Sequence, residues 1–276
     1  MTAVTAYVPL YNAERTIRCA VESVLGQTIR PAEVLVVDDG STDRSLEQLE
    51  GLDVRIVGHP RNLGRGATRA RAMSEARESL VLCCDASNAL EPDFLEKALP
   101  WLDNPRVAAV FGRMTQPPAR NVVERWRGRH LFKVDLAQQS RHHASLSTGG
   151  SLMRAAAVSE VGGYATGLRH TEDRELGDRI LAAGFDVVYD PRLAIASIAS
   201  NTLGQVLERH WRWYAGTHPA ADWRGYRKSI GYSINCMAAD DLRAGDWPSA
   251  VVSLLSPHYH FWRSLWQTWP NRRVSS

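Results

Sequence analysis

Length, composition and charge exclude several classes of protein. The chain has 276 residues, of which 44% are hydrophobic and 23% are charged, as in an ordinary globular protein that buries a substantial core. A net charge of +3 is too small to indicate a nucleic-acid partner, and no apolar run is long enough to suggest a membrane-spanning helix. We therefore expect a globular protein without a nucleic-acid ligand.

The N-terminus and the cysteines indicate a reducing compartment. MTAVTAYVPLYN lacks the basic segment and the long apolar segment of a signal peptide, so we expect a cytoplasmic protein. The four cysteines, which include the adjacent pair in LVLCCD, follow neither a metal-ligand spacing nor a disulfide spacing. They are interpreted as buried thiols.

In the first half of the chain, four short runs of β-branched and apolar residues alternate with helical patterns. The runs cover 3–10, 33–39, 54–59 and 80–85, and the helical patterns between them cover 13–28, 43–51 and 64–78. This alternation predicts an α/β fold with a mostly parallel sheet flanked by helices. Ligands bind beyond the carboxyl ends of the strands in such sheets, so we expect PLYN, DDGSTD, HPRNLG and DASN along one edge.

The second half of the chain begins with strand and turn signals and ends mainly helical. A strand is predicted at 107–114, followed by a polar, Arg-rich stretch at 119–143, a helix at 171–184 and a strand at 185–191. Beyond residue 200 the patterns are amphipathic and helical, with Pro219, Pro248 and Pro257 as expected breaks. We therefore predict a domain at 1–200 and a helical extension at 201–276 that packs on it.

The extension is basic and rich in tryptophan. From Asn201 onward there are nine Lys or Arg residues against five Asp or Glu, together with seven of the nine tryptophans. This composition suits ordinary helices packed on a domain, a carbohydrate or lipid-phosphate acceptor, or peripheral contact with a membrane surface. The sequence leaves these three interpretations open.

The motifs together resemble a known family. In order, VPLYN, VVDDGSTD, NLGRGATR, LCCDASN, TGGSLMR, VGGY and TEDRELGDRILAAG are similar to the family-2 glycosyltransferases over residues 3–191. The resemblance implies a GT-A fold, with a Rossmann-like sheet. It also implies an inverting transferase that moves a sugar from a nucleotide-diphosphate donor, a UDP-sugar by default, to a hydroxyl of a saccharide or lipid-linked saccharide. Such transfer serves polysaccharide or glycoconjugate biosynthesis.

The resemblance assigns nucleotide contacts to the first half of the chain. Pro9, Tyr11 and Asn12 match the segment that lines the base and ribose pocket. Asp39 matches the acid that binds the base ring, while Asp38 either contacts the nucleotide or accepts hydrogen bonds from turn amides.

A second group of expected nucleotide contacts follows the third strand. Asn62, Gly64 and Arg69 match a loop and helix that approach the nucleotide. For Arg69 we expect a position near the diphosphate, because a guanidinium suits phosphate geometry; the alternative is a solvated arginine.

The segment DASN departs from the family pattern. The family carries two or more acids here that hold a divalent cation, Mn²⁺ or Mg²⁺, whereas this chain has Asp85 followed by Ala, Ser and Asn88. Asp85 matches a ribose or metal contact, and Asn88 offers only a neutral oxygen. Hard cations prefer carboxylates, so we expect weakened metal binding.

The segment TED matches the catalytic base of the family. By this match Asp173 accepts the proton of the acceptor hydroxyl, and Glu172 supports the site. The alternative is that both are acids favoured at a helix N-terminus. A noncatalytic or metal-independent nucleotide-sugar-binding protein is the rival function, because the metal motif is degenerate.

Overall fold

A computed structural model shows two compact units. It describes residues 3–136, 138–168, 171–215 and 223–268. The first unit comprises residues 1–117 and 137–199, and the second comprises 118–136 and 200–276. The second unit thus combines the C-terminal helices with a segment from the middle of the chain, which the predicted boundary at residue 200 did not include.

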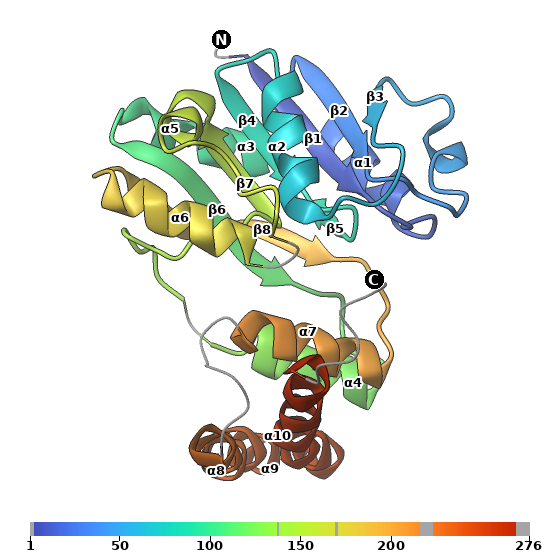
Figure 1. Ribbon diagram of the computed structural model, residues 1–276, viewed down its shortest axis with the longest axis vertical. Coiled ribbons are helices and arrows are strands. Elements are labelled where there is room, and N and C mark those ends of the chain that lie inside the picture. Colours follow the sequence, from blue (N-terminus) through green and yellow to red (C-terminus); the bar gives the residue numbers. More distant parts are fainter. Residues whose placement is uncertain (1–2, 137, 169–170, 216–222, 269–276) are drawn as a thin grey trace. The chain divides into compact units, whose positions relative to one another are not determined.

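The first unit is built on one eight-stranded sheet (Figure 1). Its strands run in the order β3-β2-β1-β4-β7-β6-β8-β5, and four of the seven neighbouring pairs are parallel. The predicted α/β class is confirmed, with antiparallel pairing around β7 and at β5. The strands are β1 (Val4–Leu10), β2 (Glu33–Asp38), β3 (Arg55–Gly58), β4 (Leu80–Cys84), β5 (Asn88–Leu90), β6 (Val107–Thr115), β7 (Gly150–Arg154) and β8 (Asp186–Ser197).

Helices cover both faces of this sheet because both faces of its strands are apolar. One face packs against α1 (Ile17–Leu25) and α3 (Phe94–Ala98), and the other against α2 (Arg65–Glu75), α5 (Ala155–Glu160) and α6 (Glu172–Ala182). Successive residues of β1 point to opposite faces, so Ala6 and Val8 join the first core and Tyr7 the second. A short 3-10 turn, Leu99–Asp103, follows α3.

The helix predicted at 43–51 is wrong. Only a 3-10 turn, Glu47–Leu49, forms there. The polar side chains at its start bind another loop instead, because Ser45 Oγ accepts from the backbone N–H of Ala13 (2.7 Å) and Asp43 accepts from that of Glu14 (3.1 Å). In the sequence these side chains indicate the start of a helix, but in the structure they accept hydrogen bonds from the loop after β1.

The second unit is helical, as predicted for the C-terminal extension. Among its described residues no strand is present, and no helix of the described chain combines the length and apolar character needed to cross a bilayer. Its elements are α4 (Val122–Trp126), the π-helical turn Arg127–Phe132, α7 (Leu203–Ala215), α8 (Trp223–Tyr232), the π-helical turn Ser233–Ala238, α9 (Ala239–Arg243) and α10 (Trp247–Thr268).

The break predicted at Pro257 is also wrong, because this proline lies inside α10. A proline has no N–H to donate to the carbonyl four residues earlier, here that of Ser253. That carbonyl accepts instead from the hydroxyls of Ser233 (2.6 Å) and Ser256 (2.9 Å), so the helix continues. Pro248 occupies the second residue of α10, where proline is tolerated, and Pro219 lies outside the described residues.

Two of the four cysteines differ from the sequence-based expectation. Cys83 and Cys84 are buried in β4, as predicted. Cys19 in α1 and Cys236 in the π-helical turn of the second unit are free and exposed.

Candidate active site

The loop after β1 and the turn after β2 are tied together. Both carboxylate oxygens of Asp38 accept from the backbone N–H of Ser41, at 3.2 and 3.3 Å, which is the turn-closing role considered for Asp38. Asn12, with a φ of 46°, donates its N–H to Ser41 Oγ (3.0 Å) and accepts from the N–H of Thr42 (2.8 Å). Beside this fixed backbone the ring of Tyr11 is 49% exposed and open to stacking.

Asp39 fixes the loop that follows β3. The residue is 3% exposed, and its two oxygens accept from the backbone N–H groups of Leu63 (2.9 Å) and Gly64 (2.8 Å). The Nδ1 atom of His59 lies 2.8 Å from the same carboxylate. Gly64 has a φ of 95°, a conformation that favours glycine, and it precedes α2.

These contacts gather the predicted nucleotide-binding residues at one edge of the sheet. They lie at or just beyond the carboxyl ends of β1, β2 and β3, the edge expected from the sequence. The residues brought together are Pro9, Tyr11, Asn12, Asp38, Asp39, Asn62 and Gly64.

Arg69 lies deeper than predicted. The residue is 2% exposed, and its guanidinium contacts Asp85 (2.7 Å), Glu172 (3.2 Å), the sulfur of Cys83 (2.9 Å) and the hydroxyl of Tyr7 (3.4 Å). This burial rules out the solvated arginine, whereas the expected position near the diphosphate stays a prediction. The guanidinium joins the end of β4 to the start of α6.

Of the four neighbours of Arg69, Asp85 and Glu172 were expected at the site, whereas Tyr7 was not singled out from the sequence and Cys83 was expected only as a buried thiol. Burial raises the pKa of Cys83 to about 11 and raises the pKa of Tyr7 well above its ordinary value, so both stay neutral at neutral pH. The positive charge of Arg69 is therefore matched by the carboxylates of Asp85 and Glu172. The available signal was the alternation of β1 and β4, which places Tyr7 and Cys83 on the face that α2 covers.

The residues proposed for metal binding supply a small donor set. One oxygen of Asp85 accepts from Arg69, and the amide nitrogen of Asn88 donates to the carbonyl of Gly149 (2.8 Å). A Cβ on Gly149 would lie 3.1 Å from the amide nitrogen of Asn88, so a larger residue would crowd this side chain. In the described part of the chain no group of three or more His, Cys, Asp or Glu could hold a metal.

This donor set fits a dedicated metal site poorly. Mg²⁺ is held by one or two carboxylates together with substrate phosphates, and Asp85 supplies a single carboxylate that Arg69 already contacts. Asn88 is 4% exposed and turned toward Gly149. We therefore derive no catalytic step through a cation.

Asp173 lies at the first turn of α6. The helix begins at Glu172, after Thr171 in the left-handed conformation with a φ of 62°. Asp173 accepts from the N–H of Arg174 (2.8 Å). Burial, and then the negative charge of Glu172, raise the pKa of Asp173, while Arg69 acts in the opposite direction. A raised pKa makes a carboxylate a better proton acceptor near neutral pH.

The loop before Asp173 packs closely on α2. The N–H of Gly66 donates to the carbonyl of Leu168 (3.1 Å), and a Cβ on Gly66 would lie 2.2 Å from the carbonyl oxygen of Ala165. Only glycine permits this approach. It brings the helix that carries Arg69 against the segment that leads to α6.

The sequence and the fold define the class of this protein. Residues 5–162 match the family described as Glycosyl transferase family 2, which is more than half of the chain. The chain therefore belongs to this family.

A curated relative and two solved structures are similar to the chain. An N-acetylglucosaminyltransferase of Mesorhizobium japonicum is 28% identical over 241 residues, covering 78% of this chain and 56% of the relative, so this chain spans little more than half its length. The mannosyltransferase PcManGT from Pyrobaculum calidifontis, in complex with GDP-Man and Mn²⁺, has a TM-score of 0.65 at 16% identity and covers 96% and 88% of the two chains. TarS 1-349 of S. aureus, in complex with UDP-GlcNAc, has a TM-score of 0.56 at 17% identity and covers 95% and 87%. At these identities the two structures show a shared fold with this chain.

Proposed function

We propose that this protein is an inverting glycosyltransferase that uses a nucleotide-diphosphate-sugar and a hydroxyl acceptor on a saccharide or lipid-linked saccharide. The observation that carries the proposal is the position of Asp173. It stands at the start of α6 next to Glu172, which Arg69 links to Asp85 at the end of β4. A noncatalytic binder has no use for a base beside the donor edge of the sheet.

In the proposed reaction Asp173 accepts the proton of the acceptor hydroxyl as its oxygen attacks the anomeric carbon. The new glycosidic bond forms on the side opposite the nucleotide, the bond to the diphosphate oxygen breaks, and the configuration inverts. Arg69 acts as a positioning residue, because its buried guanidinium holds Asp85 and Glu172 in place. Tyr11 offers an exposed ring to the base.

The donor we favour is UDP-N-acetylglucosamine. Support comes from the name of the Mesorhizobium relative and from the ligand of the TarS structure. For Asp39 we propose base recognition through the loop that it fixes, since its own oxygens already accept two amide hydrogen bonds.

The test compares Asp173→Asn with Asp178→Asn, an exposed acid on the same helix. Transfer should fall between about a hundredfold and ten-thousandfold in Asp173→Asn, the usual contribution of a general base, while donor binding in calorimetry stays near that of the wild type. The control should retain full activity. Unchanged transfer in Asp173→Asn would refute the assignment of the base.

A second candidate is a noncatalytic nucleotide-sugar-binding protein, favoured by the small donor set around Asp85 and Asn88. Donor titrations with Mn²⁺, with Mg²⁺ and with chelator separate the cases when they are paired with a transfer assay. Donor binding with no transfer to any saccharide acceptor favours the binder. Transfer that persists in chelator favours a metal-independent enzyme.

A further inference from the structure

The longest helix of the second unit, α10, buries several serines and exposes large apolar residues. Its buried side includes Ser249, Ser253 and Ser256, which are 0%, 0% and 2% exposed. A helix on the surface of a water-soluble protein normally has the opposite arrangement, with its apolar stripe toward the core. Both the burial of the serines and the exposure of the apolar residues of α10 therefore need a physical reason.

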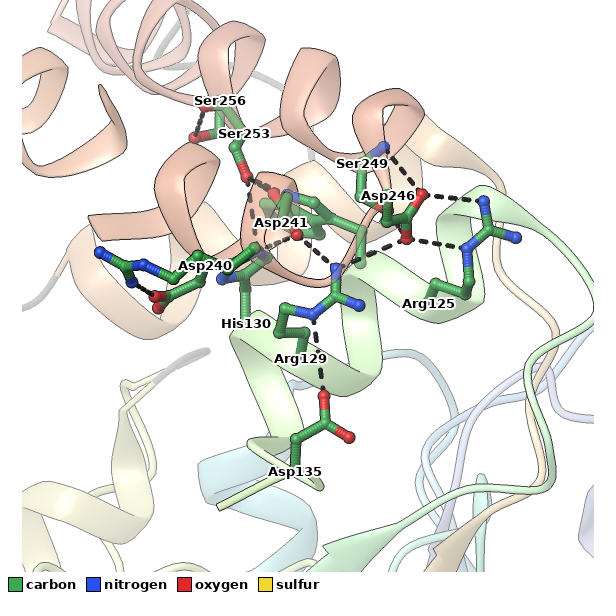
Figure 2. Close-up of polar contacts among 12 residues, drawn as sticks. Arg125, Arg129, His130, Asp135, Asp240, Asp241, Asp246, Ser249, Ser253 and Ser256 are labelled. Carbon is green, nitrogen blue, oxygen red and sulfur yellow. Dashed lines mark hydrogen bonds and ion pairs between the residues drawn. The ribbon is translucent and has the colours of Figure 1, made fainter. Parts of the chain in front are cut away.

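The buried side is explained by a polar network (Figure 2). The hydroxyl of Ser253 donates to Asp241 (2.6 Å), which also accepts from Arg129, and Ser249 donates to Asp246 (2.7 Å). His130 lies 2.8 Å from Asp241. Buried polar groups are stable when every partner is supplied, so the serines are the appropriate residues for this interior.

The other side of α10 exposes large apolar residues in one stripe. They follow the spacing i, i+4, i+7, i+8 and i+15, which lies on one side of an α-helix. Trp247 and Trp262 are 70% and 68% exposed. We call this stripe the apolar face of α10; it consists of Trp247, Val251, Leu254, Leu255 and Trp262.

The second unit, which carries this face, has a net positive charge. Residues 118–136 and 200–276 contain fourteen Lys or Arg and seven Asp or Glu, so the second unit carries +7 while the whole chain carries +3. Neighbouring α8 packs on α10 through Tyr226 and Phe261, whose rings lie 4.3 Å apart, and it exposes Arg224, Arg227 and Lys228.

The acids on α9 and in the turn before α10 already have basic partners. Asp240 pairs with Arg243 (2.5 Å), and Asp246 with Arg125 (2.8 Å). Asp241 pairs with Arg129 in the interior. Within the described part of the chain no ion pair holds the three basic residues of α8, so their charge is available to an outside partner.

We propose that the apolar face of α10 docks on an anionic lipid surface. The helix would lie in the plane of the interface, with its tryptophans at the headgroup level and its serine side against the protein. The basic residues of α8 would contact the headgroups. A protein partner would have to supply both an apolar groove and excess acid, whereas an anionic bilayer supplies both properties at once.

Vesicle sedimentation of the full chain tests the proposal without nucleotide or acceptor, so its result is independent of the proposed transferase activity. The wild type should bind phosphatidylcholine vesicles that contain phosphatidylglycerol, less so as salt rises, and phosphatidylcholine alone only weakly. The triple variant Leu254→Ser, Leu255→Ser, Trp262→Ser should lose at least about a hundredfold in partitioning, since each inserted Leu or Trp contributes about tenfold.

The charge part of the proposal has its own variant. Replacing Arg224, Arg227 and Lys228 by Gln should lower partitioning into the anionic vesicles roughly fivefold per charge removed and flatten the salt dependence.

Matched controls carry the same kinds of substitution elsewhere in the second unit. Trp213→Ser on α7 and Leu136→Ser replace side chains that are 46% and 57% exposed off the apolar face. Both should bind vesicles like the wild type. All replaced side chains are exposed, and circular dichroism and the melting temperature verify that each variant is folded.

Three results would overturn the proposal. The first is a wild type that binds neither kind of vesicle, and the second is a triple variant that binds as well as the wild type. The third is a concentration-dependent dimer in sedimentation velocity that the triple variant abolishes, with no vesicle binding, because the face would then join two copies of the chain.

Discussion

The two units differ in what surrounds their buried charged side chains. In the first unit the interior is apolar, and the buried guanidinium of Arg69 stands out against two hydrophobic cores beside the proposed site. In the second unit the interior around Asp241 is polar and much of the outer surface of α10 is apolar. In the first unit the buried charge thus lies beside the proposed site, whereas in the second unit a buried polar network shares the interior with apolar residues such as Trp126, and α10 leaves other large apolar residues exposed.

The largest effect in this comparison should come from Arg69→Met. The substitution removes the cation between Asp85 and Glu172 and leaves the buried Glu172 unpaired, so we expect a loss of about 3–5 kcal/mol in the free energy of unfolding. Arg71→Met on the same helix is the control, because Arg71 pairs with Glu75 at the surface and should cost less than about 1 kcal/mol. Equal losses in a denaturant titration would remove the distinction between buried and surface charge in the first unit.

A smaller effect is expected from Asp241→Asn in the polar interior of the second unit. Asp241 is 0% exposed and accepts from Arg129 and Ser253, so the loss of its charge should cost about 2–3 kcal/mol. Its neighbour Asp240 is exposed and pairs only at the surface with Arg243, so Asp240→Asn should be nearly neutral. Calorimetric melting that shows no difference between the two variants would mean that the polar network does not hold the second unit together.

The same network gives an acid dependence with a defined sign. Burial alone would raise the pKa of Asp241, but hydrogen bonds from His130, Ser253 and Arg129 outweigh it and lower this pKa, and Arg125 lowers the pKa of Asp246. The stability contributed by both groups is present above the ordinary carboxyl pKa of 3.8 and is lost as pH falls through the lowered values. Asp241→Asn should weaken this acid sensitivity.

The smallest effect should be a gain in stability. The pKa of Asp173 is raised by burial and by Glu172, so its ionised form is disfavoured in the folded state. The penalty is full above the raised pKa and disappears as pH falls toward the ordinary value of 3.8. Asp173→Asn should therefore stabilise the protein by at most about 1 kcal/mol at neutral pH and not at acid pH. Asp178→Asn should not change the melting temperature, and a destabilised Asp173→Asn would contradict the unfavourable ionisation of Asp173 in the folded state.

Much of the first unit could be predicted from the sequence. The alternation of strands and helices and one of the two roles considered for Asp38, closing the turn, follow from local patterns, while nucleotide binding at this edge stays a prediction. The environment of Arg69 could not be predicted, because its burial depends on how closely α2 approaches the loop before α6. The helix expected at 43–51 failed because Asp43 and Ser45 bind another loop, a tertiary contact that has no local signal.

The second unit was predicted less well for a different reason. The period of DWPSAVVSLL indicates an amphipathic helix, but it does not say which side faces the interior, and the usual assumption is reversed in α10. Pro257 was expected to break the helix because a proline leaves the carbonyl of Ser253 without its usual N–H donor. One of the hydroxyls that donates to this carbonyl instead belongs to Ser233, on another element, and such a contact has no local sequence signal. The inclusion of 118–136 in this unit rests on contacts such as Arg125 with Asp246, more than a hundred residues apart.

The contact at Gly66 limits which substitutions α2 can accept. Even an alanine would bring its methyl carbon to 2.2 Å from the carbonyl oxygen of Ala165, and a backbone atom cannot rotate away as a side chain would. The exposed neighbour Arg65 has no such restriction. We therefore expect substitutions on the outer side of this helix to be tolerated, whereas a substitution at Gly66 forces the helix and the loop apart and separates Arg69 on the helix from Glu172 beyond the loop.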